Sequence, residues 1–346
     1  MTRHEPTLRD VATAAGVSVW TVSTTYNKPH KVAEATRQRV LDAAAALGYP
    51  GPHPGARSLA RGRTGTLAFI APGDSDILLG DPAAALVARG LLSACHRGGY
   101  SLLLSERASG EMVDGRVFYR DATGADGRVP TVVIEGPGGP GVEVVGADVR
   151  GAASAMAAYL YGLGHRDVAV LACAGTEDRL EGVRDGWGGH GGLQVFSVDD
   201  LGALPPDGGA TPVMRPGPAA GEALARAALS REPRPTAILA LYDTLAVNAL
   251  NTAHWMGVDV PGDVSIAGLD DLPDSPALGL TSALIAYRPL GERAGDILTA
   301  QLAGAPVPSF PPLPTPLSIR ETTGAPPAPA STHRSSHRRP RASAPE

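Results

Sequence analysis

The feature of this 346-residue sequence that most limits its fold is a regular alternation of apolar, strand-like runs and helical stretches after Thr66. Such alternation is typical of a parallel sheet with helices on both faces, because parallel strands need a crossover connection. The pattern occurs twice, so we expect a doubly wound α/β body of two similar lobes. The segments are 67–71, 83–96, 101–104, 116–119, 131–134, 152–163, 168–172, 222–229, 237–241, 244–256, 265–269 and 291–302.

The first 49 residues follow a different, wholly helical pattern. Thr7 and Asp10 have the spacing of a capping box, which begins a helix. Gly16 supplies a turn, because glycine tolerates positive φ, and Ser18 is a good N-cap for a second helix that reaches Tyr26. Two short helices joined by so short a turn predict a helix-turn-helix.

A third helix is predicted over 34–47, where apolar residues recur at helical spacing and close a three-helix core. These residues are Val40, Leu41, Ala44 and Leu47. Ala33 precedes the helix without a side-chain oxygen to cap it, at a cost of about 1 kcal/mol. The predicted fold is therefore an all-α, three-helix helix-turn-helix headpiece followed by an α/β, two-lobed core.

Breaker-rich sequence marks the ends of these parts. Proline and glycine dominate residues 50–55, and a short hinge helix is predicted just after them, at 56–61. Beyond Thr323 the chain is rich in Pro, Ala, Ser, His and Arg, a composition that has little to bury and predicts disorder. The expected domains are a headpiece at 1–49, a hinge at 50–63, a core at 64–323 and a basic tail at 324–346.

Charge is distributed unevenly along the chain. Residues 1–63 carry nine basic and four acidic side chains, whereas residues 64–323 have a net charge of −13. A basic head on an acidic body suits a protein that offers one end to a polyanion, although a merely solvated surface explains the pattern equally well. The N-terminus lacks the apolar run of a signal peptide, and no apolar stretch approaches the length of a membrane span. We therefore expect a cytoplasmic protein without a membrane partner.

Patterns that carry catalysis are missing from the sequence. It contains no nucleophile elbow, HExxH or paired-cysteine signature, so we predict no catalytic residue, no metal site, no cofactor and no enzymatic activity. Cys95 and Cys173 lie far apart in apolar surroundings and are interpreted as buried thiols. Residues 136–141 spell GxGxxG, but two prolines interrupt them and strand-like residues follow, so a surface loop is predicted instead of a dinucleotide site. His165 follows a helix, where we expect its ring to bond carbonyl groups.

The headpiece motifs extend into a longer series of matches. They comprise Thr7–Ala12, Ala15–Ser18, Thr21–Ser23, Asn27, Leu47–Tyr49, Ala56–Leu59, Thr64–Gly65, Asp148, Gly151–Ala152, Leu163–Arg166, Arg179–Gly182, Asp243–Ala246, Val260–Ile266, Gly268–Asp271, Leu280–Thr281 and Leu317–Arg320. On these residues the chain resembles the lactose-repressor (LacI/GalR) family over about residues 7–323. The resemblance implies a dimeric transcription regulator whose core is similar to periplasmic sugar-binding proteins. The stretch between Leu104 and Val113 is shorter than the family norm, so one lobe is expected to lack a helix or to have a trimmed one.

The resemblance also implies that the second helix enters the major groove of double-stranded DNA. Val19, Trp20 and Thr24 are then expected at base edges, and Thr21, Ser23 and Asn27 at phosphates. Thr24 replaces the usual arginine, which removes a guanine contact worth roughly 1–3 kcal/mol of discrimination. A core position is the alternative for Trp20. The predicted set of DNA-binding residues is completed by Thr7, Ser18, Arg57 and Leu59.

Leu59 matches the hinge leucine that the family inserts into the minor groove at the centre of a palindromic operator. Its alternative is a core leucine at the joint between domains. In the core, Arg179 and Asp270 match the charged pair that holds a polar, sugar-like effector from opposite walls between the lobes. Tyr242 stands where an asparagine is usual, and we expect it to narrow the site and favour a smaller or flatter ligand, stacked on its ring. A salt bridge from lobe to lobe is the alternative for the charged pair, and Asp148, at the first crossover between lobes, is interpreted as structural.

The sequence thus favours an effector-controlled transcription regulator, normally a repressor, that binds a pseudo-palindromic operator as a homodimer or higher oligomer. A solute-binding protein for transport shares the expected core, but the headpiece and the missing signal peptide argue against it. A DNA-binding regulator that has lost its small-molecule control is a third hypothesis, based on Tyr242 and the shortened lobe. An enzyme is the least supported.

Overall fold

The computed structural model describes residues 6–52, 63–71, 80–107, 112–198 and 218–328. Contacts divide the chain into two units. The first contains residues 1–146 and 287–312, and the second contains residues 147–286 and 313–346. The chain therefore passes from one unit to the other three times, and each unit has a sheet of its own.

The headpiece contains three α-helices: α1 (Leu8–Ala15), α2 (Val19–Asn27) and α3 (Glu34–Leu47), with a short 3-10 helix, η1 (Pro29–Lys31), between the last two. Their shared core consists of Val11, Ala12, Ala15, Val22, Val40 and Ala44. All three predicted helices are present. The prediction that Leu41 and Leu47 lie in the core was wrong, because they are 38% and 39% exposed. The other two helices cover only a narrow stripe of α3, centred on Val40 and Ala44.

Side-chain caps fix where these helices begin. The Asp10 carboxylate accepts hydrogen bonds from the backbone N–H of Thr7 (2.8 Å) and from its hydroxyl (2.7 Å). Ser18 Oγ accepts from the backbone N–H of Thr21 at 3.0 Å. Gly16 has the predicted positive φ, 65°, in the turn between α1 and α2. These local signals in the sequence are therefore confirmed.

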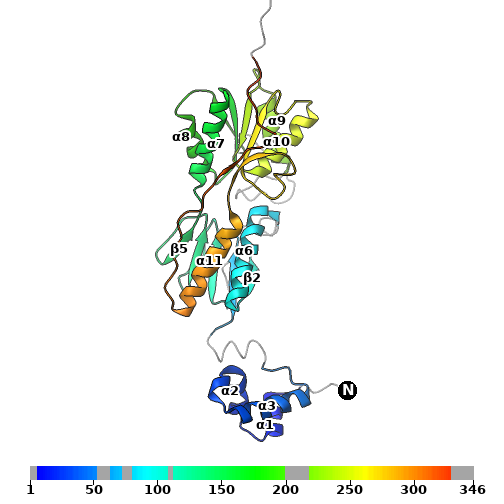
Figure 1. The fold of residues 1–346 in the computed structure, drawn as a ribbon, viewed down its shortest axis with the longest axis vertical. Helices are drawn as coiled ribbons and strands as arrows, with labels where there is room; N and C mark the ends of the chain where they lie inside the picture. Colours follow the sequence, from blue (N-terminus) through cyan, green and yellow to red (C-terminus); the bar gives the residue numbers. More distant parts are fainter. Residues whose placement is uncertain (1–5, 53–62, 72–79, 108–111, 199–217, 329–346) are drawn as a thin grey trace, which may run out of the picture. The chain divides into compact units, whose positions relative to one another are not determined.

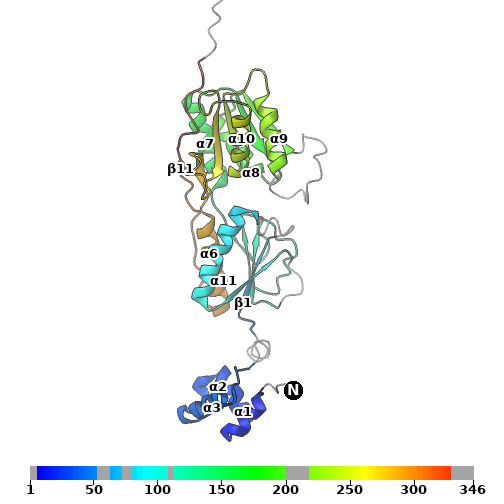
Figure 2. The ribbon, with the colours of Figure 1, turned by 90° about the vertical axis from the view of Figure 1, so that its right-hand side faces the viewer.

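The first unit also contains a five-stranded parallel sheet in the order β2-β1-β3-β4-β5. Its strands are β1 (Thr66–Ile70), β2 (Ser101–Ser105), β3 (Gly115–Tyr119), β4 (Thr131–Ile134) and β5 (Val142–Val145). Two helices, α6 (Pro82–Gly98) and α11 (Tyr287–Ala303), lie side by side on one face of this sheet (Figures 1 and 2). They approach closely through glycines, since a Cβ on Gly291 would lie 2.0 Å from the carbonyl oxygen of Val87.

The opposite face of this sheet is covered without helices in the described part of the chain. Ile70, Phe118 and Val133 form a core there, against which Ala122 and Ala125 of the segment after β3 pack. None of the described residues between β2 and β3 is helical. The stretch between Leu104 and Val113, which is shorter than the family norm, therefore joins β2 to β3 without a helix among its described residues.

The second unit contains a six-stranded sheet in the order β11-β10-β9-β8-β6-β7, parallel except for β11. Its strands are β6 (Val168–Ala172), β7 (Leu193–Ser197), β8 (Ala237–Ala240), β9 (Ser265–Asp270), β10 (Thr281–Leu284) and β11 (Leu317–Ser318). The helices are α7 (Val149–Leu163), α8 (Glu177–Trp187), α9 (Pro218–Leu229) and α10 (Asp243–Trp255). As Figure 1 shows, α7 and α8 lie on one side of this sheet and α9 and α10 on the other.

Four elements of this unit, α8, β7, β10 and β11, were not predicted. Helix α8 packs tightly on α7: a Cβ added to Gly186 would lie only 2.0 Å from the carbonyl oxygen of Ser154. The helix is short and polar, so its apolar periodicity is weak. Its glycines four residues apart, Gly182 and Gly186, were the available signal for close helix packing.

His165 is fully buried directly after α7. Its Nδ1 lies 2.9 Å from Thr236 Oγ1 and its Nε2 lies 2.9 Å from the carbonyl oxygen of Gly324. Burial lowers the pKa of His165, so the neutral ring is the buried form. The predicted structural role is confirmed. Because Gly324 also donates its N–H to Ser265 Oγ at 3.0 Å, the core extends beyond the predicted boundary at residue 323. The predicted disorder of the tail concerns mainly residues 329–346, which lie outside the described residues.

The remaining structural expectations concern the loop and the thiols. Residues 136–141 lead directly into strand β5, as predicted for a loop that does not begin a helix. Cys95 and Cys173 are buried free thiols, and burial raises the pKa of Cys95 to about 11. Across the described ranges, every helix is too short or too polar to span a lipid bilayer.

Candidate functional site

The carboxyl ends of the parallel strands in the second unit lie at one edge of the sheet. Strand β6 pairs with β7 on one side and with β8 on the other, so the crossovers diverge between β6 and β8. Ligands bind at such a switch point in open α/β sheets, outside the carboxyl ends of the strands. Arg179 lies in the first turn of α8, after β6; Tyr242 is the N-cap of α10, after β8; and Asp270 ends β9.

Arg179 contacts both of the other predicted effector residues. Arg179 Nη1 lies 3.0 Å from Asp270 Oδ1 and donates to the carbonyl oxygen of Leu241 at 2.6 Å. The Arg179 Cζ atom lies 4.3 Å from the centre of the Tyr242 ring. Arg179 is 4% exposed, and Tyr242 and Asp270 are each 1% exposed. The result is a buried cation held between a carboxylate, a carbonyl and an aromatic face.

Two expectations about this group were wrong. Arg179 and Asp270 both belong to the second unit, so they neither face each other from opposite walls nor form a salt bridge from lobe to lobe. The physical reason is the strand order, which brings the ends of β6, β8 and β9 together within one sheet. The Arg179 guanidinium lies over one face of the Tyr242 ring, and stacking of a ligand on this ring stays a prediction.

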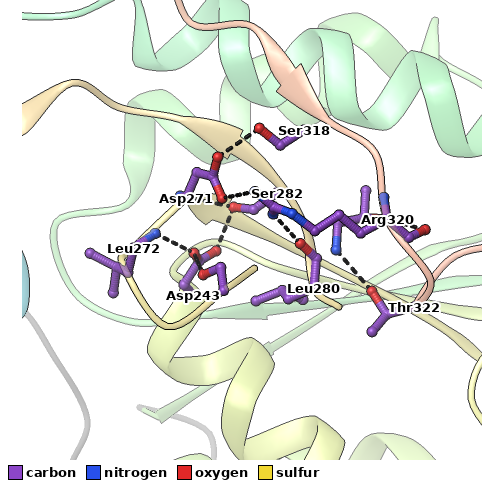
Figure 3. Close-up of polar contacts among 10 residues, drawn as sticks. Asp243, Asp271, Leu272, Leu280, Ser282, Ser318, Arg320 and Thr322 are labelled. Atoms are coloured by element: carbon purple, nitrogen blue, oxygen red, sulfur yellow. Dashed lines mark hydrogen bonds and ion pairs between the residues drawn. The ribbon is translucent and has the colours of Figure 1, made fainter. Parts of the chain in front are cut away.

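A second buried carboxylate, Asp243, lies beside this group and was not singled out from the sequence. It accepts hydrogen bonds from Leu272 N–H (2.9 Å), Ser275 Oγ (2.6 Å) and Ser282 Oγ (2.6 Å). Figure 3 shows the bonds to Leu272 and Ser282. Burial, and then the negative charge of Asp270, raise the pKa of Asp243 to about 6. An aspartate at a helix start directly after a strand was the available sequence signal.

The segment after β9 is held by a further polar cluster around Asp271 (Figure 3). Asp271 Oδ2 accepts from Ser318 Oγ at 2.6 Å, and Asp271 Oδ1 lies 2.8 Å from Arg320 Nη2. Asp270 and Asp271 have φ values of 141° and 49°, which side-chain-bearing residues rarely adopt. Such backbone strain clusters at functional sites, where the surrounding structure enforces it. The bonds around Asp243 and Asp271 therefore fix the backbone that positions Asp270.

The sheet of the first unit has its own polar residues at the carboxyl edge, which sequence reasoning missed. Arg120 follows β3 directly, and its Cζ atom lies 5.0 Å from the centre of the Tyr119 ring. Glu135 follows β4 directly. Arg120 and Glu135 both have positive φ, at 68° and 56°. Their positions immediately after buried strands were the available signal.

In the headpiece, the start of α2 carries the predicted DNA-contacting residues. Trp20 is 71% exposed and Val19 is 42% exposed, so the alternative of a core position for Trp20 does not hold. Thr24, by contrast, is only 7% exposed and does not face the solvent. Its neighbour Thr25 is 4% exposed, so this part of α2 is covered, and we do not propose Thr24 as a base contact.

The other predicted contact residues of the headpiece are hydrogen-bonded within it. Ser18 and Thr21 share a hydroxyl–hydroxyl bond of 2.9 Å, and Asn27 Nδ2 donates to Ser23 Oγ at 3.2 Å. Thr7 is exposed at the start of α1. Arg57 and Leu59 lie outside the described residues.

This combination of a helix-turn-helix headpiece with two parallel-sheet units defines a DNA-binding transcription regulator built on a periplasmic-binding-protein-like core. Residues 7–51 match the family described as bacterial regulatory proteins, lacI family, and residues 157–323 match the periplasmic binding protein-like domain. A helix-turn-helix-type transcriptional regulator of Mycolicibacterium smegmatis is 32% identical over 347 residues, which cover 85% of this chain and 91% of the relative. The chain belongs to the lacI family of bacterial regulatory proteins. It is a regulator of transcription and not an enzyme.

Solved structures agree with this fold. The lac repressor dimer bound to operator and the anti-inducer ONPF superposes with a TM-score of 0.75 at 24% identity, covering 93% of this chain and all of that chain. A complex of the transcriptional regulator CelR with cellobiose gives a TM-score of 0.60 at 25% identity, covering 92% of this chain and all of that chain. The predicted fold class is thereby confirmed, as the predicted family is by the relative that is 32% identical.

Proposed function

We propose that this regulator is a repressor that binds a pseudo-palindromic operator as a homodimer and is controlled by a small, polar, sugar-like effector. One headpiece is large enough for one half-site only, so two copies are needed to read a palindrome. The likeness to a lac repressor dimer on its operator supports this arrangement. We place its action in the cytoplasm, where bacterial DNA lies.

The observation that carries the effector proposal is the buried Arg179–Asp270 pair at the switch edge of the second sheet. A guanidinium donates in a fixed fork and a carboxylate accepts at two oxygens, so together they suit a ligand rich in hydroxyl or carboxylate groups. The CelR–cellobiose complex is a structurally similar regulator with a sugar bound. The pair alone would contribute little to the stability of the fold, because the free energy of removing two charges from water offsets their attraction.

The proposal is tested by calorimetry of the full-length protein with a panel of sugars, sugar phosphates and nucleosides, followed by operator binding with and without each ligand that binds. A ligand can shift operator affinity only through different affinities for two conformations. We expect one ligand class to change operator affinity at least tenfold in the wild type. In Arg179→Met/Asp270→Leu, ligand-free operator affinity should stay within about tenfold, roughly 1.4 kcal/mol, and the ligand effect should vanish.

A matched control uses another ion pair of the same unit. Arg231 Nη1 lies 2.8 Å from Asp167 Oδ1, immediately before β6 and therefore at the amino end of that strand. Arg231→Met/Asp167→Leu should keep the ligand effect. Loss of the effect in both double variants would show that general damage to the unit is responsible and would contradict the assignment of Arg179 and Asp270.

A regulator without a small-molecule effector is the second candidate. It is favoured by the burial of Tyr242 and by the Arg179 guanidinium over its ring, because both groups already have partners within the protein. Operator binding that no member of the panel alters, with no heat of ligand binding, would support this candidate over the first.

A further inference from the structure

The exposed start of α2 has an unusual chemistry for a surface that meets DNA. Val19–Asn27 contains no charged residue, and its two most N-terminal side chains, Val19 and Trp20, are 42% and 71% exposed. The solvent-facing side of a surface helix is usually polar, because apolar side chains lower the free energy only when they are removed from water. Two consecutive exposed apolar side chains therefore indicate a surface that is covered when the protein acts.

Polar side chains at both ends of the same helix are hydrogen-bonded to one another. The hydroxyls of Ser18 and Thr21 bond to each other, and the Asn27 amide donates to Ser23. Thr24 is buried. Recognition of guanine relies mainly on the fork of an arginine or on a lysine, and that of adenine on the amide of asparagine or glutamine. Helix α2 offers no such free group at its exposed start.

Charge identifies what covers this surface. Lys28 joins α2 to η1 and Lys31 is the last residue of η1, and both lysines are exposed. Residues 1–63 as a whole carry nine basic and four acidic side chains. An apolar patch beside basic residues fits the major groove, where phosphates line the rim and the thymine methyl group is the apolar feature of the floor.

We propose that Val19 and Trp20 recognise the 5-methyl groups of thymines, so that each operator half-site carries T·A pairs where these side chains meet the groove. The inference rests on the proposed operator binding and adds the chemistry of base selection. Among the four bases only thymine presents a methyl group in the major groove.

The test begins with selection of the operator from a random duplex library by the full-length protein. Each thymine of the selected half-site is then replaced by deoxyuridine, which removes only the methyl group, and affinity is measured at one fixed salt concentration. Removing a buried methyl should weaken binding about fourfold. We expect that loss at one or two positions of each half-site and no change at the others.

Variants connect the methyl groups with the side chains. The Trp20→Ala or Val19→Ala variant should bind operators with thymine and with deoxyuridine equally well at the position that the replaced side chain contacts. Leu41 is an exposed apolar residue on α3, and the Leu41→Ala variant should keep the fourfold difference. Trp20 is so exposed that its replacement should leave the melting temperature unchanged. Deoxyuridine tolerated at every position, or an undiminished methyl effect in both α2 variants, would overturn the inference while leaving operator binding intact. Enrichment of no sequence at all would instead overturn the proposed operator binding, and the inference with it.

Discussion

At the scale of single residues, the second unit buries ionisable side chains, which the core of a protein rarely contains. The Arg179–Asp270 pair and Asp243 are all nearly inaccessible to solvent. Removing one partner of a buried ion pair leaves the other charge unpaired, whereas replacing both with apolar residues is often close to neutral. The free energy of unfolding can therefore separate a single loss from a double one.

We predict that Arg179→Met or Asp270→Leu alone lowers the free energy of unfolding by about 3–5 kcal/mol. The double variant should recover most of that loss, because no uncompensated charge stays buried. Urea unfolding, followed by circular dichroism, measures all three. If the double variant is as unstable as the less stable single variant, the hydrogen bond from Arg179 to Leu241, and not the charge pairing, contributes most to stability.

Asp243 makes a second prediction, about pH. Its pKa is raised from 3.8 to about 6 in the folded protein, so between these values the folded state holds a proton that the unfolded state has lost. Stability from protonated Asp243 is fully present below about pH 4 and is lost as the pH rises through about 6, with a magnitude on the order of 3 kcal/mol. The wild type should thus lose stability relative to Asp243→Asn over this window. A difference that is constant from pH 4 to pH 7 would show that Asp243 titrates normally.

At the scale of elements, glycines decide how closely two helix pairs pack. Gly291 on α11 faces the backbone of α6, and Gly186 on α8 faces the backbone of α7. In each case the nearest atom is a carbonyl oxygen, which cannot move aside as a flexible side chain would. Small residues at these positions are therefore a condition for the observed distance between the helices.

Gly186→Ala should destabilise the second unit by roughly 1–3 kcal/mol, because the new Cβ would lie 2.0 Å from the carbonyl oxygen of Ser154. Gly162→Ala is the matched control. Gly162 lies in α7 with nothing within 4 Å of an added Cβ, and alanine there should stabilise by about 0.5–1 kcal/mol. Thermal unfolding of both variants measures the contrast, and equal melting temperatures would contradict it.

At the scale of the whole molecule, charge and symmetry determine how the protein meets DNA. The net charge of residues 64–323 is −13, so the body repels phosphates and leaves binding to the basic headpiece. Affinity should accordingly fall steeply as salt increases, because bound phosphates release counterions.

We predict that sedimentation at micromolar concentration gives a dimer and that two chains bind each operator. Scrambling one half-site should weaken binding by at least about tenfold, since only one headpiece then keeps its base contacts. A protein that stays monomeric in the presence of operator would contradict the homodimer. Equal affinity for the intact and the half-scrambled operator would contradict the palindrome.

Much of this molecule follows from sequence alone, because the relevant signals are local. Thr7, Asp10, Gly16 and Ser18 fix the first two helices through bonds that span three or four residues. Apolar runs predict most strands of the first sheet and half of those of the second. The family was also recognisable from motifs distributed along the chain. Short elements without strong periodicity, such as α8 and β11, were missed because their local signals are weak. They depend on packing partners far away in the sequence.

The tertiary structure decided what depends on orientation and on distant contacts. Thr24 is a polar residue between two other polar residues, Ser23 and Thr25, and only the packing of α2 shows that it is buried. Arg179 and Asp270 lie far apart in the sequence, and only the strand order reveals that they pair within one unit. The hydrogen bonds that Asp243 accepts and the backbone strain at Asp270 likewise arise where three strands end together. Local sequence determines which elements form, because backbone hydrogen bonds and caps act over a few residues; which side chains meet depends on how those elements are ordered and packed.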